Sequence, residues 1–196
     1  MTVLLVAGSP SEHSRSAALL DAVQQRLQFR GVDVERVQIR DLSPQALLLA
    51  DTSHPTVAHA LAQVARARAI VVATPVYKAA YSGVLKLFLD LLAQNAFKDK
   101  HVLPLATGGS ANHMLALDYA LRPVLQSLGA SHILSGIYAT DAQVIVLPEG
   151  GYQVLADIAQ RLDDSVNLLI AEALKEIPHV AGRFAPVHFS QVRCSV

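Results

Sequence analysis

The chain has little of what disulfide-rich, membrane-spanning or nucleic-acid-binding proteins need. Its 196 residues include one cysteine, Cys194, which excludes an intrachain disulfide framework and suits a reducing compartment. No uninterrupted apolar run approaches the length of a membrane span. The 16 basic residues balance the 16 acidic ones, so no net charge attracts nucleic acid or an anionic membrane. The first apolar run stops at Gly8 without a basic segment before it, so we expect no signal peptide and a cytoplasmic protein.

Several common site motifs are also missing. The sequence has no G-x-G-x-x-G after its first apolar run and no G-x-x-x-x-G-K-[ST], so it supports neither a dinucleotide fingerprint nor a P-loop. Its eight histidines show no H-E-x-x-H or paired metal spacing, and we expect no metal site. No base–nucleophile pair is evident near His113, so we expect a structural or solvent-facing role for it.

Alternating strands and helices are the main pattern that is present. Such alternation predicts parallel strands joined by right-handed helical crossovers. Strands are expected at Val3–Ala7, Val32–Ile39, Ala69–Ala73, His101–Ala106 and His132–Tyr138, and helices at Ala17–Arg30, Pro55–Arg68, Ser82–Gln94, Ala111–Leu128 and Tyr152–Lys175. We predict an α/β, flavodoxin-like fold with a five-stranded parallel sheet of order 2-1-3-4-5 and helices on both faces. Residues 1–177 are expected to form one domain, and residues 178–196 an irregular C-terminal tail.

The segment from Gly8 to Ser16 predicts an anion site. It follows the first strand, is rich in serine and leads into a helix, whose first N–H groups and positive dipole end favour an anion. Arg15 adds a planar cation suited to bidentate phosphate contact. An ordinary strand–helix turn with a serine cap is the alternative.

Two further loops are expected at the same edge of the sheet, where strands three and four end. Thr74–Gly83 offers apolar and aromatic side chains that could lie against a flat ring, and Ser82 can cap the next helix. Thr107–Asn112 has two glycines, which permit close approach of the backbone to a ligand. Each loop alone could be an ordinary connection. Together with the serine-rich segment they predict one binding site.

The three loops resemble those of the NAD(P)H-dependent FMN reductases, and in particular the SsuE type that serves alkanesulfonate monooxygenase. The resemblance runs from Met1 to about Gln143. It implies FMN and NADPH or NADH as cofactors, with hydride passing between them and no acid–base side chain. The cofactor-binding residues would be Ser9, Ser14, Arg15 and Ser16 at the phosphate, Pro75, Val76, Tyr77 and Lys78 along the ring, and Thr107, Gly108 and Gly109 at its pyrimidine edge.

Pro123 lies inside the expected helix Ala111–Leu128 and cannot donate to the carbonyl of Tyr119. The helix must therefore widen or bend before it. Tyr119 resembles an inserted residue that gives the SsuE type a π-helix at a tetramer interface. The alternative is a buried tyrosine before a proline kink.

The resemblance leaves three functions to compare. The preferred one is reduction of FMN by NAD(P)H, with reduced FMN released to a partner sulfonate monooxygenase. The second is a quinone, azo-compound or metal-ion reductase that retains FMN. The third is a flavodoxin-like electron carrier, which the neutral charge and the lack of tryptophan disfavour.

Overall fold

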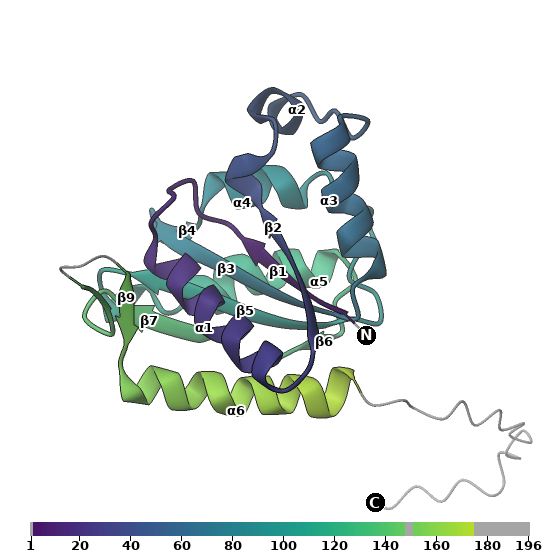
Figure 1. The fold of residues 1–196 in the computed structure, drawn as a ribbon. Coiled ribbons are helices and arrows are strands. Elements are labelled where there is room, and N and C mark those ends of the chain that lie inside the picture. The colour runs from purple at the N-terminus through teal and green to yellow at the C-terminus, as the bar shows by residue number, and fades with distance from the viewer. Residues whose placement is uncertain (1, 148–150, 175–196) are drawn as a thin grey trace, which may run out of the picture.

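A central parallel sheet with helices on both faces makes up the fold (Figure 1). The computed structural model describes residues 2–147 and 151–174, so the predicted tail 178–196 lies outside it. The sheet consists of β1 (Thr2–Ala7), β2 (Asp33–Gln38), β3 (Ala69–Tyr77), β5 (His101–Gly108), β6 (His132–Ile133) and β7 (Ile137–Thr140), with the short β4 (Ala80–Tyr81) antiparallel to β3. Because β6 and β7 are two parts of the fifth predicted strand, the order β2-β1-β3-β5-β6/β7 confirms the predicted 2-1-3-4-5.

The break in the fifth strand lies opposite Pro104 of β5. The carbonyl of Val102 accepts a hydrogen bond from the N–H of Leu134 in this strand. The backbone of Pro104, two residues further along β5, faces the same neighbouring strand but has no N–H to donate to it. The register shows one extra residue at this point. Val102 pairs with Ile133 and Leu105 with Ile137, so three steps along β5 match four steps along its neighbour.

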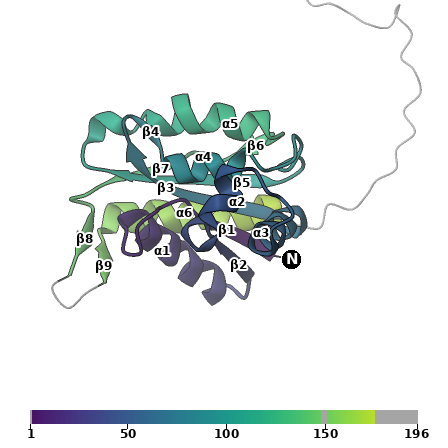
Figure 2. The same cartoon turned by 90° about the horizontal axis from the view of Figure 1, so that it is seen from above.

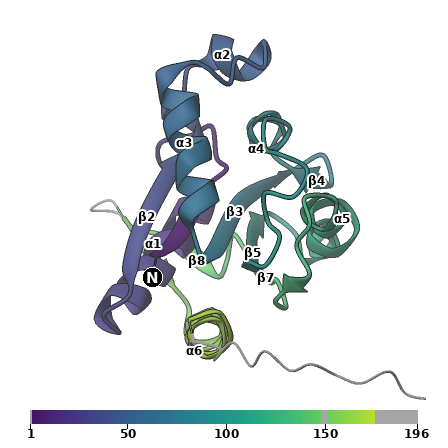
Figure 3. The same cartoon turned by 90° about the vertical axis from the view of Figure 1, so that its right-hand side faces the viewer.

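Helices lie on both faces of the sheet (Figures 2 and 3). Two layers of apolar side chains hold them there. On one face, α1 (Arg15–Phe29) and α6 (Ala156–Ala173) cover side chains such as Leu5 and Leu103. On the other, α3 (Pro55–Arg66), α4 (Gly83–Leu89) and α5 (Arg122–Ser127) cover side chains such as Leu4 and Val102. The central strands are apolar on both sides because both faces are covered.

Three predicted helices differ from those in the structure. The helix predicted to continue to Gln94 ends at Leu89, with turns from there to β5. The start of the predicted helix Tyr152–Lys175 is wrong: β9 (Tyr152–Val154) pairs with β8 (Val144–Val146), and α6 begins at Ala156. The third prediction, Ala111–Leu128, is divided into a 3-10 turn, a π-helix and α5. Two further elements, 3-10 turn Ile39–Asp41 and α2 (Pro44–Leu48), were not predicted.

A π-helix spans Leu117–Leu121, with Tyr119 at its centre. Arg122 donates its backbone N–H to the carbonyl of Leu117, five residues earlier, and Pro123 follows directly. The helix therefore widens just before the proline, as its missing N–H predicts. None of the helices in residues 2–147 and 151–174 has the length and apolar character needed to cross a membrane.

Candidate functional site

A cavity of about 250 Å³ lies where β1, β3 and β5 end. The three predicted loops meet there, with a contribution from the turn after β7. Of the residues predicted as cofactor-binding, the lining includes Ser14, Arg15, Pro75, Val76, Tyr77, Thr107, Gly108 and Gly109. Ser11, His13 and Asp141 also line it and were not predicted. The convergence follows from topology, because the carboxyl ends of neighbouring parallel strands share one edge.

The loop after β1 closes tightly onto the sheet before it opens into α1. Gly8 donates its N–H to the carbonyl of Ala73 at 2.8 Å, and a Cβ on Gly8 would lie 2.9 Å from that oxygen. Ser14 then caps α1, its Oγ accepting from the N–H of Ala17 at 3.1 Å. The first turn of a 15-residue helix thus faces the cavity and can bind an anion there.

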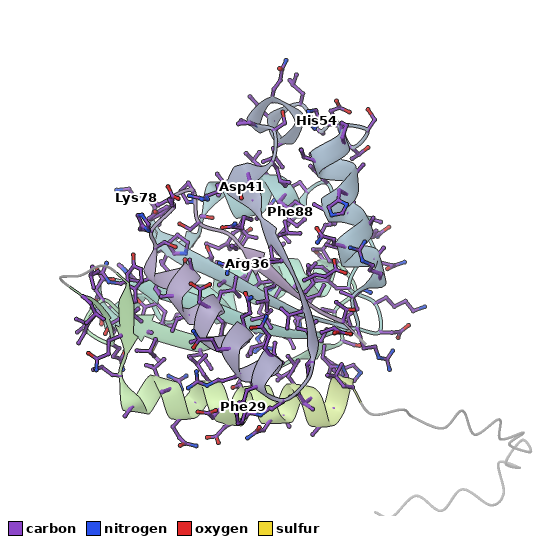
Figure 4. All side chains as sticks on the ribbon, in the orientation of Figure 1. Phe29, Arg36, Asp41, His54, Lys78 and Phe88 are labelled. Atoms are coloured by element: carbon purple, nitrogen blue, oxygen red, sulfur yellow. The ribbon has the colours of Figure 1, made fainter. Side chains whose placement is uncertain are left out.

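Three predicted site residues do not line the cavity. Ser9 is buried, and its Oγ accepts from the N–H of Ser11 at 3.1 Å, so it shapes the loop. Ser16 is also buried, with its Oγ 3.2 Å from that of Ser14. Lys78 lies at the outer edge of the molecule (Figure 4). Ser9 and Ser16 thus support the loop after β1 from behind.

Arg15 is held at the cavity by the turn after β7. Its Nε donates to the carbonyl of Val144 at 3.0 Å, and its Nη1 lies 3.5 Å from Oδ2 of Asp141. Both side chains remain partly exposed, with exposed fractions of 35% for Arg15 and 49% for Asp141. The guanidinium is thus oriented by protein contacts while it still faces solvent.

The loop after β3 is a tight hairpin that presents an aromatic edge. Val76 pairs with Tyr81 and Tyr77 with Ala80, leaving a two-residue turn at Lys78 and Ala79. Both turn residues have left-handed backbones, with φ of 51° and 64°. A two-residue turn of this type requires positive φ at both positions and normally uses glycine or asparagine, so this hairpin is strained. Tyr77 beside it is 49% exposed.

The loop after β5 is shaped by contact with Tyr138. A Cβ on Gly108 would lie 2.5 Å from the Tyr138 hydroxyl, so any larger residue there would force the Tyr138 ring to shift. That hydroxyl donates to the carbonyl of Ser110 at 2.6 Å, and its burial together with the charge of Asp141 raises the pKa of Tyr138. Tyr138 therefore stays protonated and fixes the loop. A Cβ on Gly109 would meet nothing closer than 3.9 Å, so its backbone is open to a ligand.

The cavity thus combines a helix start and an arginine that suit an anion, an apolar and aromatic wall, and an accessible backbone edge. These features fit a phosphate, a flat ring and the polar edge of that ring.

A second cavity of about 450 Å³ lies between β2 and α3. Its lining includes Arg36 and Asp41, labelled in Figure 4, and no residue of the three loops. In the described part of the chain, no cluster of three or more His, Cys, Asp or Glu side chains could hold a metal ion.

Comparison with known proteins decides the family. A family model described as NADPH-dependent FMN reductase matches residues 1–146. This chain belongs to that family. An FMN reductase (NADPH) from Pseudomonas putida is 49% identical over 185 residues, which cover 93% of each chain. An FMN reductase (NADPH) from Escherichia coli is 48% identical over 145 residues, covering 74% of this chain and 76% of the relative.

A solved structure extends the similarity to the fold. The apo form of an NADH:FMN oxidoreductase (EMOB) superposes with a TM-score of 0.81 at 36% identity, covering 90% of this chain and 91% of that one. As a member of the NADPH-dependent FMN reductase family, the chain is an NAD(P)H:FMN oxidoreductase, with FMN and a reduced nicotinamide nucleotide as its cofactors. The anion site and the apolar wall described above suit the phosphate and ring of FMN.

Proposed function

We propose that this FMN reductase treats FMN as an exchangeable substrate and supplies reduced FMN to a separate monooxygenase of the alkanesulfonate type. One observation carries the proposal: the ring-facing wall is open. Tyr77 is 49% exposed, and the anion-binding Arg15 is 35% exposed. A flavin bound against such a wall keeps one face accessible to a nicotinamide and can leave after reduction. The sulfonate partner rests on the resemblance of the three loops to the SsuE type.

The proposed roles of the residues follow their positions. Ser14, Arg15 and the first turn of α1 hold the phosphate, with Ser9 and Ser16 supporting the loop. The hairpin residues Pro75, Val76 and Tyr77 support the ring, with Lys78 at their outer end. Backbone groups of Thr107, Gly108 and Gly109 bind the pyrimidine edge, where fixed N–H dipoles stabilise negative charge. The chemistry of the bound cofactors is hydride transfer from nicotinamide to flavin, for which the protein supplies binding and orientation.

The same proposal includes a homotetramer. Met114, Leu115 and Tyr119 form an exposed apolar patch on and before the π-helix, and Tyr119 is 79% exposed. Large apolar side chains gathered on one surface are typical of protein interfaces. In the SsuE type the π-helix lies at a tetramer interface, and we assign this patch the same role.

Steady-state kinetics test the exchange of FMN. We expect saturable dependence of NADPH or NADH oxidation on added FMN, and reduced FMN free in solution under anaerobic conditions. Reduced FMN should cross a dialysis membrane and support a sulfonate monooxygenase on the far side. A protein that keeps a stoichiometric yellow cofactor through dialysis and turns over only with quinones or azo compounds would instead be the retaining type of reductase.

A further inference from the structure

Asp141 places a carboxylate beside the cation proposed to bind the FMN phosphate. Its Oδ2 lies 3.5 Å from Nη1 of Arg15, and both residues line the same cavity. A Cβ on Gly109 would also have Asp141 Oδ2 as its nearest neighbour, at 3.9 Å. The carboxylate therefore lies between the anion site and the loop after β5, inside the space that a ligand would enter.

The turn that carries Asp141 is held firmly. The side-chain oxygen of Gln143 accepts from the backbone N–H of Thr140 at 2.9 Å, and its amide donates to Asp157 of α6 at 2.6 Å. The N–H of Asp141 itself donates to the carbonyl of Gly108 at 3.2 Å. With the bond from Arg15 Nε to Val144, these contacts hold the backbone that carries Asp141 and the guanidinium that faces it. The backbone of the turn therefore keeps the Asp141 carboxylate close to the cavity when a second anion arrives.

We propose that Asp141 sets the affinity for FMN by competing with its phosphate for Arg15. Asp141 contacts Nη1 of Arg15, and a phosphate would need the same terminal N–H groups because Nε already donates to Val144. The phosphate carries up to about two negative charges. Phosphate binding must therefore displace or share the contact with Asp141 and tolerate a like charge close by. This inference rests on the proposed function, which assigns Arg15 to the phosphate.

The competition gives Asp141 a definite role in exchange. An arginine alone would bind oxidised and reduced FMN tightly, because both carry the same phosphate. A fixed carboxylate weakens both complexes while keeping the specificity for a phosphorylated flavin. Asp141 thereby acts on affinity through Arg15 rather than on the hydride transfer, and we describe it as a positioning residue.

The test compares flavins with and without a phosphate. In Asp141→Asn we expect the dissociation constant for FMN to fall about three- to tenfold, because one partly exposed competing charge is removed. The dissociation constant for riboflavin, which has no phosphate, should not change. Asp164→Asn is the matched control, since it removes the same charge from an exposed position on α6 and should alter neither value. Flavin fluorescence titration and thermal melting measure binding and folding on the same samples.

Arg15→Ala separates this inference from the proposed function. If Arg15→Ala weakens FMN but Asp141→Asn leaves FMN binding unchanged or weakens it, the competition is overturned and the phosphate site stands. If Arg15→Ala does not weaken FMN, the phosphate site is wrong and the competition falls with it. An equal gain for FMN and riboflavin in Asp141→Asn would also overturn the competition, because it would place the carboxylate at the ring. A folded Asp141→Ser variant gives the same comparisons should Asp141→Asn be unstable.

Discussion

The Ser82 hydroxyl donates a hydrogen bond to the carbonyl of Gly8, which joins the start of α4 to the end of β1. Ser82 also donates its N–H to Oγ1 of Thr74 at 3.0 Å, and its Oγ accepts from the N–H of Leu85 at 3.3 Å. All of these bonds are buried. One serine therefore holds together the loop after β1, the loop after β3 and the first turn of α4.

Ser82→Ala should loosen the site and destabilise the fold. The carbonyl of Gly8 would lose its side-chain donor and α4 would lose its cap, which costs about 1–3 kcal/mol of unfolding free energy. FMN binding should weaken as well, because two of the three loops lose their link. Chemical denaturation and FMN titration measure both effects. Ser127→Ala removes an exposed hydroxyl at the end of α5 and should change stability by less than about 0.5 kcal/mol. Equal effects of the two substitutions would argue against the linking role.

Gly108→Ala should damage the site through its contact with Tyr138. The new methyl group would lie 2.5 Å from the Tyr138 hydroxyl, and forcing it in should cost about 1–3 kcal/mol. Gly109→Ala is the neighbouring control, since its methyl group meets nothing closer than 3.9 Å. Adding Tyr138→Phe to Gly108→Ala should restore part of the stability, because the clashing atom is removed. Thermal melts of the unchanged protein, the two single glycine variants and the double variant measure these stabilities. No recovery of stability in the double variant would contradict the proposed clash.

Ala79→Gly should stabilise the hairpin beside the cavity. Ala79 has a φ of 64°, and a left-handed backbone costs a non-glycine residue about 1–2 kcal/mol. Glycine avoids that strain but loses more entropy on folding, so the net gain should be about 0.5–1 kcal/mol. Ala80→Gly lies in β4, where only the entropy loss applies, and should destabilise. Denaturation curves with opposite shifts for the two variants are the expected result, and shifts of the same sign would contradict it.

Stability should fall in acid because of His101. Its ring stacks on His132 at the amino end of the sheet, with centroids 4.6 Å apart. Burial, His132 and Arg68 lower the pKa of His101 below its usual 6.5, although Glu172 opposes them. A base with a lowered folded pKa resists protonation, so the unfolding free energy decreases as the pH falls through the unfolded value.

Two variants check this pH dependence in opposite directions. His132→Asn removes a group that lowers the pKa of His101 and should flatten the loss of stability in acid. Glu172→Gln removes the opposing carboxylate and should steepen it. Urea unfolding between about pH 8 and about pH 5 measures both slopes. Parallel curves for the two variants would show that His101 does not control the effect.

Deletion of Tyr119 should remove the π-helix and weaken subunit association. Without this residue the N–H of Arg122 can bond four residues back, and a regular helix results. Tyr119→Ala keeps the chain length, and so the widened turn, while it removes the exposed ring. Sedimentation velocity and FMN turnover distinguish the two contributions. Unchanged sedimentation in the deletion variant would remove the π-helix from the interface.

The sequence predicted the sheet well because its signals are local and repeated. Each apolar run ends at a turn, and alternation with helices leaves few possible topologies. The convergence of the loops after Ala7, Ala73 and Ala106 followed directly from that topology. The burial of Ser16 was harder to predict from the sequence, because it depends on which face of α1 packs against the sheet. Lys78 was predicted to bind the cofactor only from its position in the loop, and the structure places it at the outer end of the hairpin.

The turn at Asp141 could not be predicted from these signals. Asp141 reaches Arg15 only because Gly108, Gln143 and Asp157 hold the chain there, and these contacts span distant parts of the sequence. The strand Tyr152–Val154 was mistaken for helix for a related reason. Its pairing with β8 is a tertiary contact, and three residues carry too little periodicity to show it.

Pro104 has a consequence at the far end of its own strand. Alternation from Leu134, which packs on the α1 and α6 face, would place residue 138 on that same face. The extra residue opposite Pro104 reverses the parity, so Ile137 takes the α1 and α6 face and Tyr138 the other. The ring that closes against Gly108 therefore follows from the extra residue opposite Pro104, four positions earlier in β5. A one-residue bulge opposite Pro104 thus determines which side chain faces the edge where the three loops meet.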